Sequence, residues 1–193
     1  MKNTLIAIAL ATAGLAAIPL TSHAADNTGG FFINGNVGDS NVSKGLYDDD
    51  DTGFGGNVGY RWAVAPNVLL GVEGGYTDLG KFSTGNNVNG FFPDAEIKGW
   101  TLGANGHFNL TPNWYVSGRA GFFRADIKGA YFDPANAVVR VDDTANKWYA
   151  GAGFGYDFSN NFGIGLNYDY YKADKSNLDL NADLISVSAE YRF

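Results

Sequence analysis

His107 has the side chain best suited to acid–base or nucleophilic chemistry, because it is the only histidine after residue 24. A hydrolase would combine such a histidine with a serine nucleophile and an orienting acid, or with paired aspartates. Ser117 is the nearest plausible hydroxyl, and no local motif links it to His107. The chain has no cysteine, which excludes a thiol nucleophile and a disulfide framework. We therefore predict neither enzymatic activity nor a cofactor.

Asp48 to Asp51 form the densest run of charge in the chain. Carboxylates at this density are potential Ca²⁺ ligands, but the alternating ligand positions and the bidentate residue of a Ca²⁺ loop are absent. Such a run usually lies in a solvated loop. We predict no specific metal site here, and whether the run binds a cation stays open.

The elements that position these side chains are strands, because apolar and polar residues alternate with period two through most of the chain. Segment 162–171 shows this plainly: Phe, Ile, Leu and Tyr alternate with Gly, Asn and Asp. Eight such segments have about the length of a tilted membrane strand: 31–38, 53–62, 68–77, 97–108, 114–127, 148–158, 162–171 and 183–193.

The connections between these segments alternate in length. Three are short and carry Pro or Asn, which favour turns: 63–67, 109–113 and 159–161. Four are longer and polar and are expected to be loops: 39–52, 80–95, 128–146 and 173–182. Short turns at one end and long loops at the other are typical of an outer-membrane barrel with periplasmic turns.

Residues 1–24 have the pattern of a cleaved signal peptide. Lys2 precedes an apolar stretch at 5–20, and residues 22–24 supply the small residues of a cleavage site. Subtracting Lys2 from the 13 basic residues leaves 12 against 20 acidic ones, a formal charge of −8 that is unlike a nucleic-acid-binding surface. No later apolar run is long enough for a transmembrane helix. Residues 25–193 would therefore cross a membrane only as strands.

We predict that residues 25–193 form an all-β, eight-stranded antiparallel up-and-down transmembrane β-barrel. In hydrocarbon every backbone donor and acceptor must be paired internally, so a sheet can cross only when it is closed. Tryptophan and tyrosine near the strand ends fit aromatic girdles. A soluble sandwich or lipocalin-like barrel would turn its apolar face inward, and the small polar face of these strands makes a poor exterior for it.

Strand parity points charged and polar side chains into this barrel. The charged ones are Arg61, Glu73, Arg119 and Glu190, and the polar ones are Asn57, Asn105, His107 and Asn167. Buried charges persist only when they are paired and hydrogen-bonded. Two interpretations stay open: a polar plug that fills the lumen and fixes the register, or a narrow, low-conductance path for water and ions past Glu73 and Arg119.

Three stretches resemble the OmpA-type transmembrane barrel family. GVEGGYTDLGK at 71–81 resembles its third strand, and SGRAGFFRAD at 117–126 resembles its fifth. ISVSAEYRF at 185–193 is similar to the terminal strand of outer-membrane barrels, in which Tyr191 and Phe193 match the signal read by the barrel-assembly machinery. The resemblance implies the outer membrane of a Gram-negative bacterium. The peptidoglycan-binding domain of large family members is not expected, because the chain ends with the barrel.

The same resemblance implies an ion-pair network that gates the lumen. Its central glutamate falls on Glu73 and one arginine falls on Arg119. Its other arginine, a second glutamate and a lysine fall on Gly165, Gly155 and Asn105. The chain therefore departs from the family pattern at the positions that matter most for gating.

The resemblance implies two functional classes. The first is a structural outer-membrane component with low-conductance porin activity. The second is a surface adhesin or host- or phage-interaction barrel that acts through its long loops. Exposed apolar residues in two loops would suit the second class, or they extend the strands beyond the membrane: Phe91, Phe92, Tyr131, Phe132, Val138 and Val139. We expect a monomer whose partners are outer-membrane lipid and lipopolysaccharide, the assembly machinery, and a host or phage ligand.

Overall fold

The computed structural model describes residues 29–44, 47–83, 94–132, 138–158, 161–175 and 178–193. Within these ranges no helix is long and apolar enough to span a membrane. The signal peptide predicted at 1–24 lies outside the described residues and stays a prediction. The described elements are eight strands: β1 (Gly30–Lys44), β2 (Tyr47–Ala65), β3 (Val68–Ser83), β4 (Asp94–Asn109), β5 (Trp114–Phe132), β6 (Val138–Asp157), β7 (Phe162–Lys175) and β8 (Leu178–Arg192).

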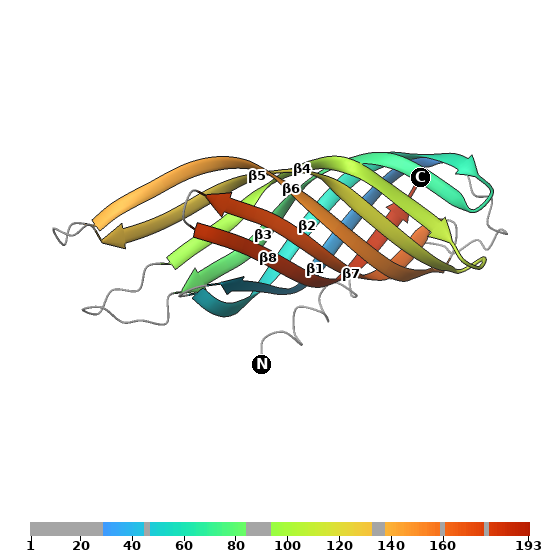
Figure 1. The fold of residues 1–193 in the computed structure, drawn as a ribbon. Coiled ribbons are helices and arrows are strands. Elements are labelled where there is room, and N and C mark those ends of the chain that lie inside the picture. Colours follow the sequence, from blue (N-terminus) through green and yellow to red (C-terminus); the bar gives the residue numbers. More distant parts are fainter. Residues whose placement is uncertain (1–28, 45–46, 84–93, 133–137, 159–160, 176–177) are drawn as a thin grey trace.

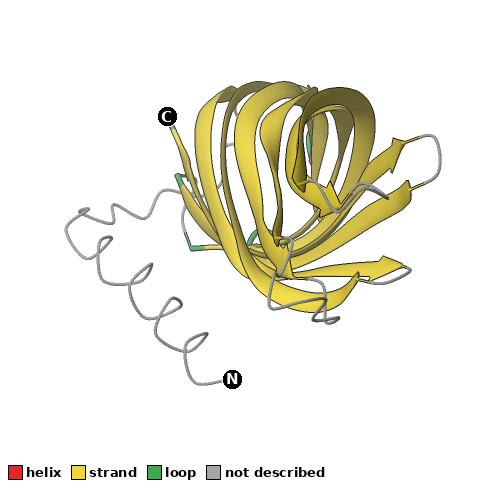
Figure 2. Cartoon of the chain, turned by 90° about the vertical axis from the view of Figure 1, so that its left-hand side faces the viewer, coloured by secondary structure: helices red, strands yellow, loops and turns green. Residues whose placement is uncertain are grey.

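The strands form one closed antiparallel barrel in sequence order (Figure 1). β1 pairs with β2 along its length and with β8 from Phe32 to Val42, and this last pairing closes the ring (Figure 2). The predicted eight-stranded up-and-down barrel is confirmed. The end with short connections after β2, β4 and β6 is called the turn end below, and the opposite end is called the loop end.

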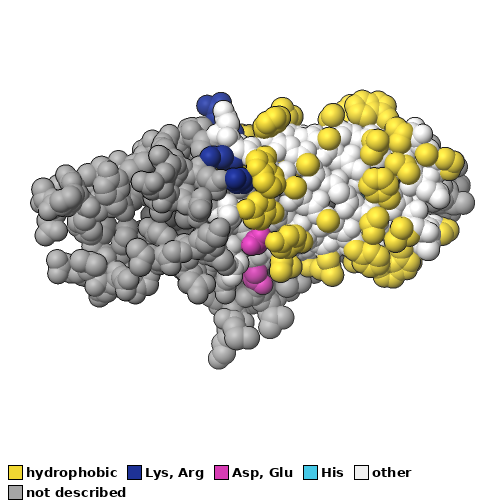
Figure 3. All heavy atoms as spheres, in the orientation of Figure 1, with side chains coloured by type: hydrophobic (Ala, Val, Ile, Leu, Met, Phe, Trp, Pro, Cys, Tyr) yellow, Lys and Arg dark blue, Asp and Glu magenta, His cyan; other side chains and the backbone are white. Residues whose placement is uncertain are grey.

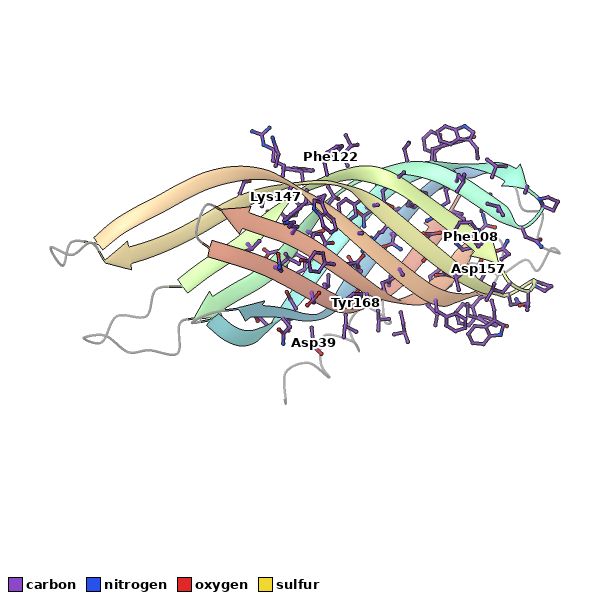
Figure 4. The ribbon with its side chains drawn as sticks, viewed as in Figure 1. Asp39, Phe108, Phe122, Lys147, Asp157 and Tyr168 are labelled. Carbon is purple, nitrogen blue, oxygen red and sulfur yellow. The ribbon has the colours of Figure 1, made fainter. Side chains whose placement is uncertain are left out.

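An apolar belt covers the outer face of the barrel (Figure 3). On β4 it runs from Trp100 to Phe108, nine residues, which is about the length that a tilted strand needs to cross hydrocarbon. Phe122 and Phe108 lie near its two edges (Figure 4). Aromatic rings form contacts along both edges, as expected of girdles: Tyr76–Trp100 and Trp148–Tyr170 at the loop end, and Phe31–Tyr60, Trp114–Tyr156 and Tyr191–Phe193 at the turn end.

The strands extend much further at the loop end than the sequence predicted. β5 and β6 stay paired as far as Phe132 and Val138, so most of 128–146 is a strand hairpin and not a loop. Tyr131 and Val139 lie in this ladder, whereas Phe91 and Phe92 lie outside the described residues. Beyond the membrane the outer face meets water, so the apolar alternation that marks a membrane strand is lost although the backbone ladder continues.

The acidic run is also in a strand and not in a loop. β2 begins at Tyr47, and Asp48 to Asp51 pair with Ser43 to Ser40 of β1. The expected loop at 39–52 shrinks accordingly, and the same correction applies to 80–95 and 173–182, into which the neighbouring strands continue. The backbone ladder does not depend on apolar alternation, so it continues through these mostly polar residues.

An arginine at the centre of the belt should destabilise the barrel. Ala104→Arg places a charge against lipid at mid-depth on β4 and is expected to cost about 2–4 kcal/mol, whereas Asn146→Arg, which lies beyond the loop-end girdle, should cost at most about 1 kcal/mol. Urea unfolding in lipid vesicles measures both changes. Equal costs for the two variants would show that the belt is not the lipid-facing surface.

Candidate functional site

The lumen holds the residues that the sequence pointed inward, beginning with a bidentate ion pair. Arg61 of β2 donates from Nη1 and Nη2 to the two carboxylate oxygens of Glu190 on β8, at 2.5 and 3.0 Å. Its Nε donates to Oδ1 of Asn105 on β4 at 2.6 Å. Its guanidinium also lies over the ring of Phe32, 4.1 Å from the centroid. Each of the three guanidinium nitrogens of Arg61 therefore donates a charge-assisted hydrogen bond within the barrel.

Glu73 continues this network toward the loop end. Its Oε2 accepts a hydrogen bond from Asn105 Nδ2 at 3.1 Å, and its Oε1 accepts one from the Tyr149 hydroxyl at 2.9 Å. Tyr149 reaches across the lumen from β6, and a Cβ at Gly103 would lie 2.5 Å from its hydroxyl oxygen. Glycine at 103 is thus required for the tyrosine to reach the carboxylate.

Arg119 has a different partner from the one that the resemblance suggested. Its Nε and Nη2 donate to the carboxylate oxygens of Asp169 on β7 at 2.6 and 2.5 Å. The two side chains meet over Gly151 of the intervening strand β6, where a Cβ would collide with the aspartate. The structure therefore brings Glu73 to Asn105 and Tyr149, and Arg119 to Asp169.

His107 lies in a polar cluster at the turn end. Its Nε2 is 3.2 Å from Oδ2 of Asp157, and its ring stacks on Tyr115 with centroids 4.1 Å apart. Asp157 also pairs with Arg192 Nη2 at 2.6 Å. His107 is almost completely buried. Its contacts hold it against the barrel wall, with Ser117 directly opposite on β5.

The remaining predicted lumen residues line the same space. Asn57 accepts a hydrogen bond from the Thr101 hydroxyl at 3.3 Å, and Asn167 donates to Ser188 Oγ at 2.8 Å. Among the described side chains, no group of three or more His, Asp or Glu residues could hold a metal ion. Tyr191 and Phe193 lie outside the lumen, on the outer face at the turn end, where their rings are in contact.

An apolar plug fills the lumen at the loop end. Its members come from six strands and are all buried: Leu79, Ile97, Phe123, Ala125, Tyr149, Tyr171, Ala182 and Leu184. Phe123 and Tyr171 make an edge contact, with ring centroids 5.0 Å apart, and Tyr171 stacks on Tyr149. Tyr149 belongs both to the plug and to the hydrogen-bond network of Glu73. The plug therefore rests directly on the polar part of the lumen.

A small polar cavity remains between the plug and the turn end. It has a volume of about 40 Å³, and its walls include Glu73, Arg119, Asn167, Ser117 and Ser188. A water molecule needs about 10–15 Å³ by this measure, so the cavity has room for roughly two or three. The described interior is thus a cavity with polar walls, bounded by the apolar plug on its loop-end side.

A ring of polar side chains surrounds the barrel directly beyond the loop-end girdle. On β8, β1 and β3 it carries Asp183, Asp39 and Asp78, and on β4, β5 and β7 it carries Lys98, Arg124 and Lys172, together with Asp126, which follows Arg124 on the same face of β5 and pairs with Lys98 in the ladder. Charged side chains gather at that edge of the belt (Figure 3), and Asp39 lies beside it (Figure 4). The lysine and arginine side chains of the described rim therefore lie on one side of the barrel, with Asp126 among them.

Sequence reasoning missed the plug and several partners in the lumen. Alternation along the strands also puts Asp169 and Asp157 on the inward face, but their pairing with Arg119 and Arg192 does not follow from it. Gly151 was the available signal for the first pair, because a glycine between two inward charges leaves room for them to meet. The plug was missed because the sequence treats the inward face as polar throughout, whereas Phe123 and Leu184, within predicted strands, and Leu79, just beyond one, are apolar and face inward.

The closed barrel, its lipid-facing belt and its filled lumen define a transmembrane β-barrel. Residues 8–193 match the family described as Outer membrane protein beta-barrel domain. The chain therefore belongs to this family of outer-membrane β-barrel proteins, which confirms the resemblance to small barrels of this class and indicates an outer-membrane location. No curated protein sequence gives a match.

Solved structures of small outer-membrane proteins share the fold. The attachment invasion locus protein Ail of Yersinia pestis is 22% identical, with a TM-score of 0.57 over 86% of this chain and 99% of that chain. The same protein in complex with the heparin analogue sucrose octasulfate has a TM-score of 0.55, with the same identity and coverage. Neisserial surface protein A is 14% identical, with a TM-score of 0.54 over 84% of this chain and 97% of that chain.

Removing one partner of the Arg119–Asp169 pair should be costly. Arg119→Met leaves a buried carboxylate without its partner, and Asp169→Leu leaves a buried guanidinium, so each is expected to cost about 3–5 kcal/mol. The double variant should lose much less than the sum, because it removes both charges. Urea unfolding of the four proteins gives the coupling free energy, and strictly additive losses would show that the pair does not interact.

Proposed function

We propose that this protein is a structural component of a Gram-negative outer membrane whose lumen is closed at rest. The observation that carries this proposal is the apolar plug at the loop end, whose eight side chains are at most 2% exposed. A path for ions past Glu73 and Arg119 would have to pass this plug, whose own side chains offer ions no polar ligands other than two tyrosine hydroxyls. The low-conductance porin activity that the sequence left open therefore requires the plug to move.

The remaining expectations fit this proposal. A cleaved signal peptide at 1–24 would deliver residues 25–193 to the periplasm, and Tyr191 and Phe193 would present the signal for barrel assembly. Outer-leaflet lipid and lipopolysaccharide would surround the belt and the charged rim. The contacts of His107 with Asp157 and Tyr115 favour a structural role over catalysis. The sequence suggests no nucleophile other than Ser117, and the cluster would lie at the periplasmic end of the barrel.

Single-channel recording tests the closed lumen. The protein purified from outer membranes should give no conductance steps in a planar bilayer, whereas Phe123→Ser combined with Tyr171→Ser should give small steps, because it removes the two rings in edge contact within the plug. Phe122→Ser combined with Tyr170→Ser makes the same changes one residue away, on the lipid-facing side, and should stay silent. Steps in the wild type that the plug variant leaves unchanged would refute the proposal.

A second function, recognition of a host or phage surface, is favoured by the β5–β6 hairpin. This hairpin continues ten residues beyond Phe122, about 30 Å of strand at 3.3 Å per residue, and projects from the barrel (Figure 1). It stands on the side where β4, β5 and β7 carry Lys98, Arg124 and Lys172 on the outer rim, with Asp126 among them. A sulfated ligand such as the heparin analogue bound by Ail in its crystal structure would suit the basic side chains of this group.

Shortening the hairpin tests this second function. Replacing residues 129–141 with Asn-Gly joins Lys128 to Asp142, which pair in the ladder, through a two-residue turn. The variant should keep its folded barrel by circular dichroism and lose adherence to host cells and binding of sucrose octasulfate. Replacing residues 42–49 with Asn-Gly shortens the β1–β2 hairpin in the same way and serves as the control. Unchanged binding after the first replacement would exclude the hairpin as a ligand site.

A further inference from the structure

The charges of the polar part of the described lumen, between the plug and the turn end, do not balance. Its three arginines each pair with a carboxylate: Arg61 with Glu190, Arg119 with Asp169, and Arg192 with Asp157. The polar part of the lumen holds a fourth carboxylate, that of Glu73, which no arginine contacts in this arrangement. One negative charge is therefore left over at mid-depth of the barrel.

The groups that face Glu73 are neutral or already paired. Its oxygens accept hydrogen bonds from the Asn105 amide and the Tyr149 hydroxyl, and neither donor carries a charge. Arg119 lies within electrostatic range, but with Asp169 it forms a pair of zero net charge. His107 contacts Asp157, which Arg192 already neutralises. Only 5% of Glu73 is exposed, and a carboxylate buried to this degree requires a counter-charge or a proton.

The cavity beside Glu73 offers oxygen ligands. Asn167 donates its amide hydrogen to Ser188, and its Oδ1 is a carbonyl oxygen that can accept a hydrogen bond or ligate a cation. Oδ1 of Asn167 and Oγ of Ser117 both lie next to Gly153, at the place where a Cβ would be. Both residues line the cavity of about 40 Å³, together with Glu73. That volume suits a partly hydrated small ion with one or two waters.

We propose that Glu73 and these neutral oxygens bind one monovalent cation of the size of Na⁺ or K⁺ as a structural ion of the lumen. A single positive charge balances the one carboxylate left over, and neutral oxygens can replace part of the hydration shell of such an ion. A divalent ion would leave an excess of positive charge, and it prefers more carboxylates than this site has. The apolar plug closes the site toward the loop end, so the ion exchanges through the turn end. The site exists whether or not the barrel conducts.

Equilibrium unfolding tests the site in the protein purified from outer membranes. Urea unfolding is compared in chlorides of choline, Na⁺, K⁺ and Rb⁺ at constant ionic strength and pH, with choline as the cation too large to enter. Binding to the folded state alone raises the folding equilibrium constant by 1 + [M⁺]/Kd, which is about 100-fold at 100 times Kd. The wild type should therefore be more stable in Na⁺ or K⁺ than in choline.

Two variants separate the site from general charge effects. Glu73→Gln keeps the shape of the side chain and removes its charge, so the difference between Na⁺ or K⁺ and choline should disappear. Asp39→Asn makes the same change in net charge on the outer rim, where the side chain is exposed, and should keep the difference. A wild type that is equally stable in all four salts would overturn the proposal.

Two further experiments complete the test: one distinguishes a bound cation from a proton on Glu73, and the other replaces the Glu73→Gln variant if it does not fold. If acidification stabilises the wild type regardless of the salt, and Glu73→Gln abolishes this effect, then a proton neutralises Glu73 and the proposal is wrong. If Glu73→Gln does not fold, wild-type crystals soaked in thallous ions replace it as the test. An anomalous peak in the cavity beside Glu73 is expected, and its absence would refute the site.

Discussion

Backbone amides in hydrocarbon have no water to bond, and the rest of the structure depends on this constraint. β1 can satisfy its second row of donors and acceptors only by pairing with β8, and that pairing closes the barrel. Closure fixes the stagger of the strands, and the stagger decides which inward side chains share a level. The contact of Arg61 on β2 with Glu190 on β8, across β1, is one result of this geometry. The chemistry of the lumen therefore follows from the way the backbone meets the membrane.

At the loop-end girdle, the apolar face of the barrel wall changes from the outer face to the inner face. On β5, Phe122 faces lipid while Arg119 faces the lumen, as in a membrane strand. Directly beyond, Phe123 and Ala125 face inward while Arg124 points out, as in a soluble barrel. On β5 the alternation does not break. The medium outside changes from hydrocarbon to water, so the side of the strand that must be apolar changes with it. The apolar plug is the core of this water-exposed extension.

Strand parity made much of the fold predictable from the sequence. It identified the eight strands, the short turns and the inward position of Glu73 and Arg119. It could not identify partners, because Arg119 and Asp169 lie on strands separated by β6, and their meeting depends on the stagger of the whole barrel. It also placed the strand ends too early, because a strand that faces water on its outer side has the composition of a loop. The acidic run of β2 shows this most clearly.

The main effect of the polar network is to select the correct strand register, and its contribution to stability is smaller. Buried ion pairs contribute little compared with apolar packing of the same volume, but breaking one is costly. Each lumen pair joins strands that are not neighbours: Arg61 to Glu190 across β1, Arg119 to Asp169 across β6, and Asp157 of β6 to Arg192 of β8 across β7. A slip of two residues in any intervening strand keeps the outer belt apolar, yet it separates these charges. The lumen pairs therefore penalise the misregistered barrels that the belt alone would accept.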